Sequence, residues 1–94
     1  MSVTPIIGTN VTVPVGGTPV QAIPPDPAGG VITNPYDAIE PLFVNPLGDA
    51  DTSAGGATFA LQPGQEWNVI PGQTTQTTVN AATAGHAFSA IYWL

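Results

Sequence analysis

The 94-residue chain has no cysteine, so it cannot form a disulfide, and it has no Cys/His cluster that would hold a structural zinc ion. A single domain of this size buries only about 63% of the surface area that its unfolded chain exposes. Small domains without such supports are often stabilised by association with another subunit. We therefore expect one domain at most, assembled as a homo-oligomer.

Lysine and arginine are absent as well, and the formal net charge is −6 at pH 7. Affinity for nucleic acids and for anionic membranes depends largely on these two side chains, so we expect no nucleic-acid partner and no membrane partner. A salt bridge within the chain can form only through His86, and we expect acidification not to destabilise the fold through lost ion pairs. The acidic residues are Asp26, Asp37, Glu40, Asp49, Asp51 and Glu66.

Long apolar runs and helical periodicity are also missing. No apolar run approaches the ~20 residues of a membrane span, and the N-terminus lacks the pattern of a signal peptide. Instead, 11 prolines and 11 glycines separate short runs of Val, Ile, Thr, Phe and Trp, in which apolar residues recur with a period of two. This pattern predicts an all-β fold, a small antiparallel β-sandwich or barrel.

The valines of residues 9–23 alternate along the chain and precede a Gly16-Gly17 turn. Two glycines tolerate the positive φ angles of a tight turn, so this segment is predicted to form a hairpin. Pro14 and Pro19 cannot donate ladder hydrogen bonds, which places its strands at a sheet edge or makes them an arm that lies along another surface.

The first ten residues are predicted to form an extended, proline-containing N-terminal arm, and residues 11–94 to form the single β-domain. Ile6 and Ile7 lie in this arm. Exposed isoleucines without a cover promote aggregation, so we expect both side chains to contact a neighbouring subunit or a larger surface.

The later part of the chain contains six further runs that are predicted to be strands, at residues 31–34, 39–45, 57–62, 66–70, 76–82 and 87–93. In the last run, Ile91 and Trp93 face the side opposite to the core, so we expect them at a subunit interface. Alternation places the following residues in the core: Leu42, Val44, Phe59, Leu61, Trp67, Val69, Val79, Ala81, Phe88, Ala90 and Tyr92.

Two polar segments connect these runs. Residues 46–56 are small, polar and acidic, and we expect an exposed tip. Asp49 and Asp51 resemble the start of a calcium loop, but the bidentate glutamate of such a loop is missing, so a solubilising role is favoured. Residues 73–78, QTTQTT, are predicted to form a solvated strand face.

No residue pattern indicates catalysis, a cofactor or a metal, and we expect that the protein is not an enzyme. His86 has no partner nucleophile and no second histidine, which favours a turn or strand-edge imidazole with one hydrogen bond. A pH sensor at an interface is the one functional use left open. The acidic residues near Ile39 could act as paired carboxylates, as in glycosidases, but so short a chain has little room for a cleft.

The aromatic residues Tyr36, Trp67, Tyr92 and Trp93 allow two interpretations. They could form a platform on which sugars stack. They could also anchor the core and a subunit interface, where Trp and Tyr are both enriched. The register of Trp67 with the predicted core favours the second interpretation.

Four segments, VTVPVGGTPVQAI, GGVITNPYDAIEPLFVNPLG, GATFALQPGQEWNVIPG and TTVNAATAGHAFSAIYW, together resemble the small all-β virion proteins of tailed bacteriophages. These are capsid decoration (cement) proteins or related head and tail accessory proteins, and the resemblance spans about residues 11–93. The chain departs from that pattern at residues 28–30, where the related sequences often have an arginine, and in its proline-rich segment 24–27.

The resemblance implies a structural virion protein that decorates or cements a phage capsid through protein-protein contacts. Its expected partners are the major capsid protein or other virion subunits, and its expected oligomer is a trimer. It would be assembled in the host cytoplasm and located in the virion, without a cofactor. The alternative is a carbohydrate- or host-surface-binding β-module of a phage fibre or spike.

Overall fold

The computed structural model describes residues 5–7 and 11–94, and within these residues every regular element is a β-strand. All strand pairings are antiparallel, which confirms the predicted all-β fold. The described strands are β1 (Ile6–Ile7), β2 (Thr12–Val13), β3 (Val20–Ile23), β4 (Gly29–Thr33), β5 (Leu42–Asn45), β6 (Phe59–Leu61), β7 (Glu66–Asn68), β8 (Thr77–Asn80), β9 (His86–Ala87) and β10 (Ser89–Trp93).

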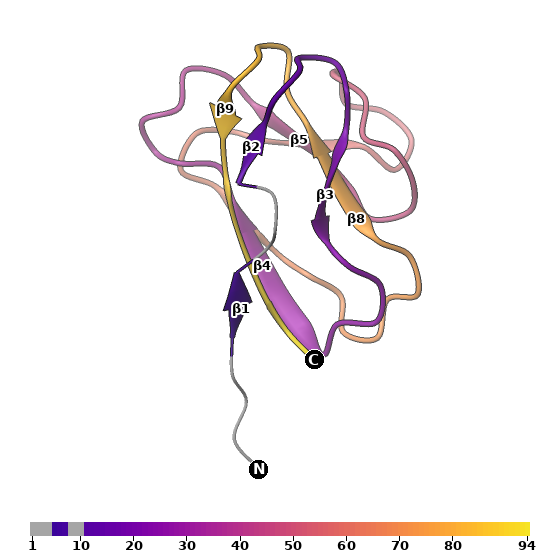
Figure 1. The fold of residues 1–94 in the computed structure, drawn as a ribbon. Helices are drawn as coiled ribbons and strands as arrows, with labels where there is room; N and C mark the ends of the chain where they lie inside the picture. The colour runs from indigo at the N-terminus through magenta and orange to yellow at the C-terminus, as the bar shows by residue number, and fades with distance from the viewer. Residues whose placement is uncertain (1–4, 8–10) are drawn as a thin grey trace.

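The strands form two four-stranded sheets, with the orders β1-β10-β4-β7 and β3-β8-β5-β6, and a two-stranded ribbon of β2 and β9. Only Phe88 separates β9 from β10. Because β2 pairs with β9 and β1 pairs with β10, the ribbon continues the first sheet (Figure 1). When β1 with β2 and β9 with β10 are each counted as one interrupted strand, the sheet orders become 1-8-3-6 and 2-7-4-5. This is the strand order of a jelly roll, one form of β-sandwich.

One apolar cluster joins the two sheets. Ile32 of the first sheet and Val44 and Val79 of the second are fully buried in it. Every predicted core residue belongs to this cluster or packs against it, with Phe59, Trp67 and Tyr92 only partly buried. The alternation also missed four members that lie before residue 33, namely Val13, Ala22, Ile23 and Ile32.

The predicted hairpin over residues 9–23 is wrong. β2 pairs with β9, whereas β3 pairs with β8 in the other sheet. The Gly16-Gly17 turn does form, but it packs on the chain after β8: Gly17 N donates to Ala81 O, and a Cβ on Gly16 would clash with Ala82 O. The turn therefore carries the chain from one sheet to the other.

The predicted N-terminal arm lies mostly outside the described residues. Its two isoleucines form β1 and pair with β10, Ile6 opposite Tyr92 and Ile7 opposite Ile91. Ile7 remains 72% exposed in this position. The boundary at residue 10 and the extended arm stay predictions.

The loop over residues 46–56 is not simply an exposed tip, because Ala50 is buried within it. Thr78 Oγ1 accepts a hydrogen bond from Ala50 N at 2.9 Å and donates one to Gly48 O at 2.7 Å. Asn80 Nδ2 donates to Ala50 O at 2.8 Å. The loop thus folds back over β8 and covers it.

The expectation of a solvated QTTQTT segment is wrong for half of it, although residues 74–76 are exposed as expected. Thr77 and Thr78 are fully buried and Gln73 nearly so. Gln73 Nε2 donates to Pro46 O at 2.8 Å and contacts Thr77 Oγ1 at 2.9 Å. These side chains satisfy loop backbone groups that would otherwise be buried without partners, which is why polar residues occupy an interior strand.

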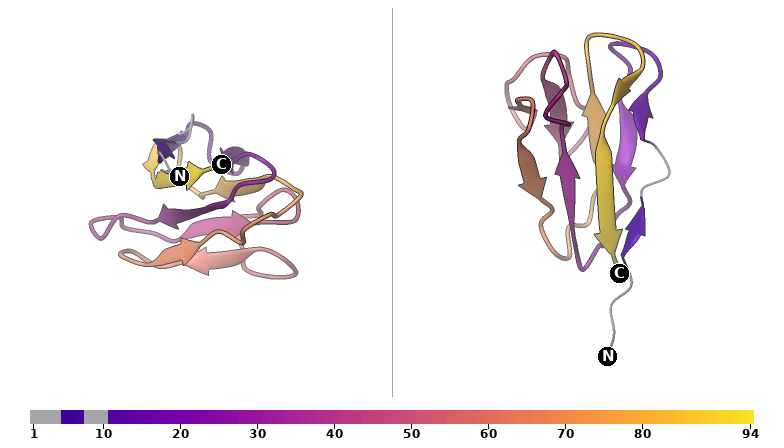
Figure 2. Two further views of the ribbon diagram at one scale, coloured as in Figure 1. Left: turned by 90° about the horizontal axis from the view of Figure 1, so that it is seen from below. Right: turned by 90° about the vertical axis from the view of Figure 1, so that its left-hand side faces the viewer.

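The strands run between two ends of the molecule, where the connecting loops gather (Figures 1 and 2). The turn between β8 and β9 lies at the end opposite to the C-terminus. The candidate site lies beside this turn.

Candidate functional site

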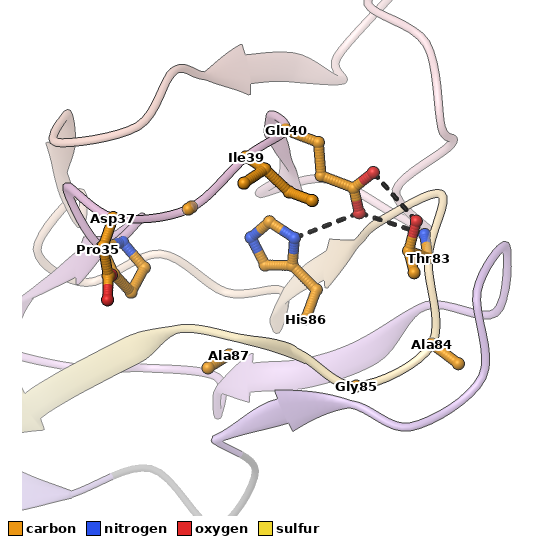
Figure 3. Close-up of a pocket in the computed structure, with 10 residues that line it drawn as sticks. Pro35, Asp37, Ile39, Glu40, Thr83, Ala84, Gly85, His86 and Ala87 are labelled. Carbon is orange, nitrogen blue, oxygen red and sulfur yellow. Dashed lines mark hydrogen bonds and ion pairs between the residues drawn. The ribbon is translucent and has the colours of Figure 1, made fainter.

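A hollow of about 310 Å³ opens between the loop that follows β4 and the turn that leads into β9 (Figure 3). Pro35 and Pro41 bracket the loop, and Gly85 adopts a φ of 82° that turns the chain into β9. Two segments far apart in the sequence therefore form the walls. The lining residues are Pro35, Asp37, Ala38, Ile39, Glu40, Thr83, Ala84, Gly85, His86 and Ala87.

His86 lies at the base of this hollow with a side chain only 5% exposed. Its Nε2 is 2.9 Å from Asn34 Oδ1. The Asn34 amide group donates from Nδ2 to Leu61 O at 2.9 Å and to Glu40 O at 3.1 Å. Because both of these partners are carbonyl acceptors, the Asn34 oxygen must face the imidazole, and Nε2 must be the donor.

The other ring nitrogen also faces an acceptor. His86 Nδ1 is 3.2 Å from Glu40 Oε1, and the ring points toward this carboxylate in Figure 3. Thr83 adds two donors to the same group, from its backbone N at 3.1 Å and from Oγ1 at 3.0 Å. When the imidazole is protonated, both ring nitrogens donate, and the imidazolium pairs with the Glu40 carboxylate. We call Asn34, Glu40, Thr83 and His86 the His86 clamp.

The electrostatics of Glu40 agree with this geometry. Burial acts to raise the pKa of Glu40, but the hydrogen bonds from His86 and Thr83, together with the charge of His86, outweigh it. The pKa therefore lies below its ordinary value of 4.5. The contacts with His86 and Thr83 therefore favour the ionised form of Glu40.

His86 follows the Gly85 turn and begins β9, as expected of a turn or strand-edge imidazole, but the expectation of one hydrogen bond is wrong. His86 contacts two side chains, and these come from the end of β4 and from the loop after it. The contacts span 46 and 52 residues of sequence, so no local motif could reveal them. The absence of lysine and arginine was the one sequence signal for this site, because it left His86 as the one side chain able to supply the positive charge of an ion pair.

The four residues predicted at an interface lie elsewhere, on β1 and β10. Ile7 lies on β1, the edge strand of the first sheet, and pairs with Ile91 on the neighbouring strand β10. Trp93 is half-buried because its indole lies against Gly29, where a Cβ would approach the ring to 2.6 Å. Ile6 lies opposite Tyr92. The structure describes one chain, and an interface role for these residues stays a prediction.

The aromatic residues are divided among different environments. Trp67 packs against the core and contacts Phe59, with ring centroids 5.3 Å apart. Tyr92 also packs against the core, whereas Tyr36 is 87% exposed in the loop beside the hollow. This distribution fits core anchors better than one continuous stacking platform.

Among residues 5–7 and 11–94, no group of three or more His, Cys, Asp or Glu side chains is arranged to hold a metal ion. Asp49 and Asp51 are exposed in the loop between β5 and β6. The described part of the chain also has no helix long and apolar enough to cross a membrane. Comparisons with protein-family models, curated proteins and solved structures find no match to this chain.

Proposed function

We propose that the protein is a structural virion protein that decorates or cements a phage capsid through protein-protein contacts. The observation that supports this most directly is the sheet order of a jelly roll, an architecture used by viral capsid domains. A fold alone does not specify a function. The support therefore rests on the fold together with the four sequence segments that resemble phage virion proteins.

The charge of the chain is compatible with this role. A shell protein assembles around packaged nucleic acid, and a chain without lysine or arginine has no electrostatic attraction for phosphate. A trimer would place three copies at a local three-fold axis of a shell.

Attachment to a shell can be measured directly. Purified protein is mixed with undecorated heads of the phage or prophage that encodes it, and bound protein is measured after sedimentation. We expect saturable binding, with a copy number set by the shell symmetry, and a trimer by light scattering. Absence of the protein from purified virions by mass spectrometry, together with no binding to heads, would rule the proposal out.

The alternative is a carbohydrate- or host-surface-binding module, and one observation favours it. Tyr36 is 87% exposed and precedes the exposed Asp37 in the sequence, and an exposed aromatic ring offers a face on which a sugar can stack. A glycan array discriminates between the two functions. Specific glycan binding that is lost in Tyr36→Ala would favour the module over the shell protein.

A further inference from the structure

The geometry points to a docking surface on the loop of residues 35–41, and we propose that its occupant is an apolar segment carrying lysine or arginine from a different protein. This inference rests on the proposed function, because it names the surface through which the chain would contact its shell partner. Three features of the loop support it: fixed conformation, exposed apolar side chains and charge.

The loop is held in one conformation. Ala38 N donates to Pro35 O at 3.1 Å, which closes a turn inside the loop. At the far end, Asn34 Nδ2 donates to the Glu40 backbone, and the Glu40 carboxylate binds Thr83 and His86. A loop that is already ordered loses little conformational entropy when a partner binds.

Two large side chains that this loop presents are apolar. Ile39 is 95% exposed and Tyr36 is 87% exposed. Single exposed apolar residues are normal on a protein surface. Here two large ones lie on the same loop, Tyr36 within its turn and Ile39 just after it. The hollow beside them, lined by Ala38, Ala84 and other residues, can receive a side chain from a partner. Tyrosine is enriched among the residues that dominate interface energies.

Charge identifies the kind of partner. Asp37 is exposed on the same loop and lines the hollow. A second copy of this chain has no lysine or arginine to place opposite it, and its His86 is already paired within the clamp. Contact between two copies here would bring like charges together, which is unfavourable. The complementary cation must therefore come from a different, basic partner.

The test uses the full chain and two synthetic peptides of equal length, in which leucine alternates with lysine in one and with glutamate in the other. Binding is followed by two-dimensional NMR of the 15N-labelled protein. We expect the lysine peptide to shift amide signals of residues 35–41 and 83–87, and the glutamate peptide to leave them unchanged. Ile39→Ser should raise the Kd roughly tenfold, and Asp37→Asn roughly threefold with a weaker salt dependence.

Two matched variants serve as controls. Leu47→Ser removes another exposed apolar side chain, and Asp51→Asn removes another exposed carboxylate, both in the loop between β5 and β6. Neither should change the Kd. Equal binding of the two peptides, shifts centred on another surface, or no binding at millimolar peptide would overturn the inference.

The outcome for the docking surface can be separated from that for the proposed function. If wild-type protein sediments with phage heads and Ile39→Ser sediments equally well, the docking surface is wrong while the proposed function stands. If the wild type does not bind heads and is absent from purified virions, the proposed function fails, and the peptide titration still decides whether residues 35–41 select a basic apolar segment.

Discussion

Asn34 Oδ1 lies 2.9 Å from His86 Nε2, although 52 residues separate the two in the sequence. Asn34 is completely buried at the end of β4, and His86 begins β9. Asn34 thus donates from Nδ2 to two backbone carbonyl groups, and its Oδ1 accepts a hydrogen bond from the His86 imidazole. The position of the loop after β4 depends on this contact.

Replacing Asn34 by alanine should lower the free energy of unfolding by about 1–3 kcal/mol. The substitution leaves Leu61 O without its donor at a buried position and deprives His86 Nε2 of its acceptor. Urea unfolding measures the change. Asn68→Ala, at an exposed position of β7, is the control and should change stability by less than about 0.5 kcal/mol. Equal effects of the two substitutions would contradict the role of Asn34.

The His86 ring should show two hydrogens protected from solvent. Exposed imidazole N–H hydrogens exchange rapidly, whereas both ring nitrogens of His86 face acceptors within 3.2 Å. NMR at mildly acidic pH should therefore detect slowly exchanging signals from Nδ1–H and Nε2–H. In Asn34→Ala the Nε2–H signal should be lost. A single protected ring hydrogen in the wild type would show that the ion pair with Glu40 does not form.

Acid should weaken the fold through Glu40, which reverses the expectation drawn from the sequence. The pKa of Glu40 is lower in the folded chain than its ordinary value of 4.5, so the unfolded chain binds a proton first. The contribution of Glu40 to the free energy of unfolding is complete above its ordinary pKa of 4.5. It is lost as the pH falls through the lower pKa that Glu40 has in the folded chain. A solvent-accessible pair contributes roughly 0.5–1 kcal/mol.

Glu40→Gln should accordingly be less stable than the wild type at neutral pH, and the difference should shrink as the pH falls below 4.5 and through the lower pKa of the folded state. Glu66→Gln, at an exposed position of β7, is the control. Chemical unfolding at a series of pH values gives both curves. A Glu40→Gln variant whose stability difference is the same at every pH would show that the ion pair contributes nothing.

Alternation along the sequence identifies core residues such as Leu42, Val44 and Val79, because successive side chains of a strand face opposite sides. The same rule cannot explain why Thr78 and Asn80 are buried, because their polarity predicts exposure to solvent. They are buried because the loop over residues 46–56 folds onto them, and their own side chains hold that loop. Such mutual dependence between distant segments appears only in three dimensions, as does the His86 clamp.

A methyl group at Gly29 should destabilise the end of the β4–β10 pair, where Gly29 lies opposite Trp93. A Cβ there would lie 2.6 Å from Trp93 Cζ2, so the indole must move away from β4. We expect Gly29→Ala to cost about 1–3 kcal/mol and to shift the tryptophan fluorescence. Gly48→Ala is the control, because no heavy atom lies within 4 Å of its added Cβ. An unchanged emission spectrum and stability would show that Trp93 does not pack on Gly29.

Thr78→Val tests whether the buried polar side chains of β8 hold the loop between β5 and β6. Valine has the same shape as threonine but cannot accept from Ala50 N or donate to Gly48 O. Because Ala50 N would lose its acceptor at a buried position, we expect a loss of about 1–3 kcal/mol in the free energy of unfolding. Hydrogen exchange at the Ala50 amide should accelerate before the core amides exchange. Thr74→Val, at an exposed position, should leave both measurements unchanged. If Ala50 stays protected in Thr78→Val, apolar packing alone fixes the loop.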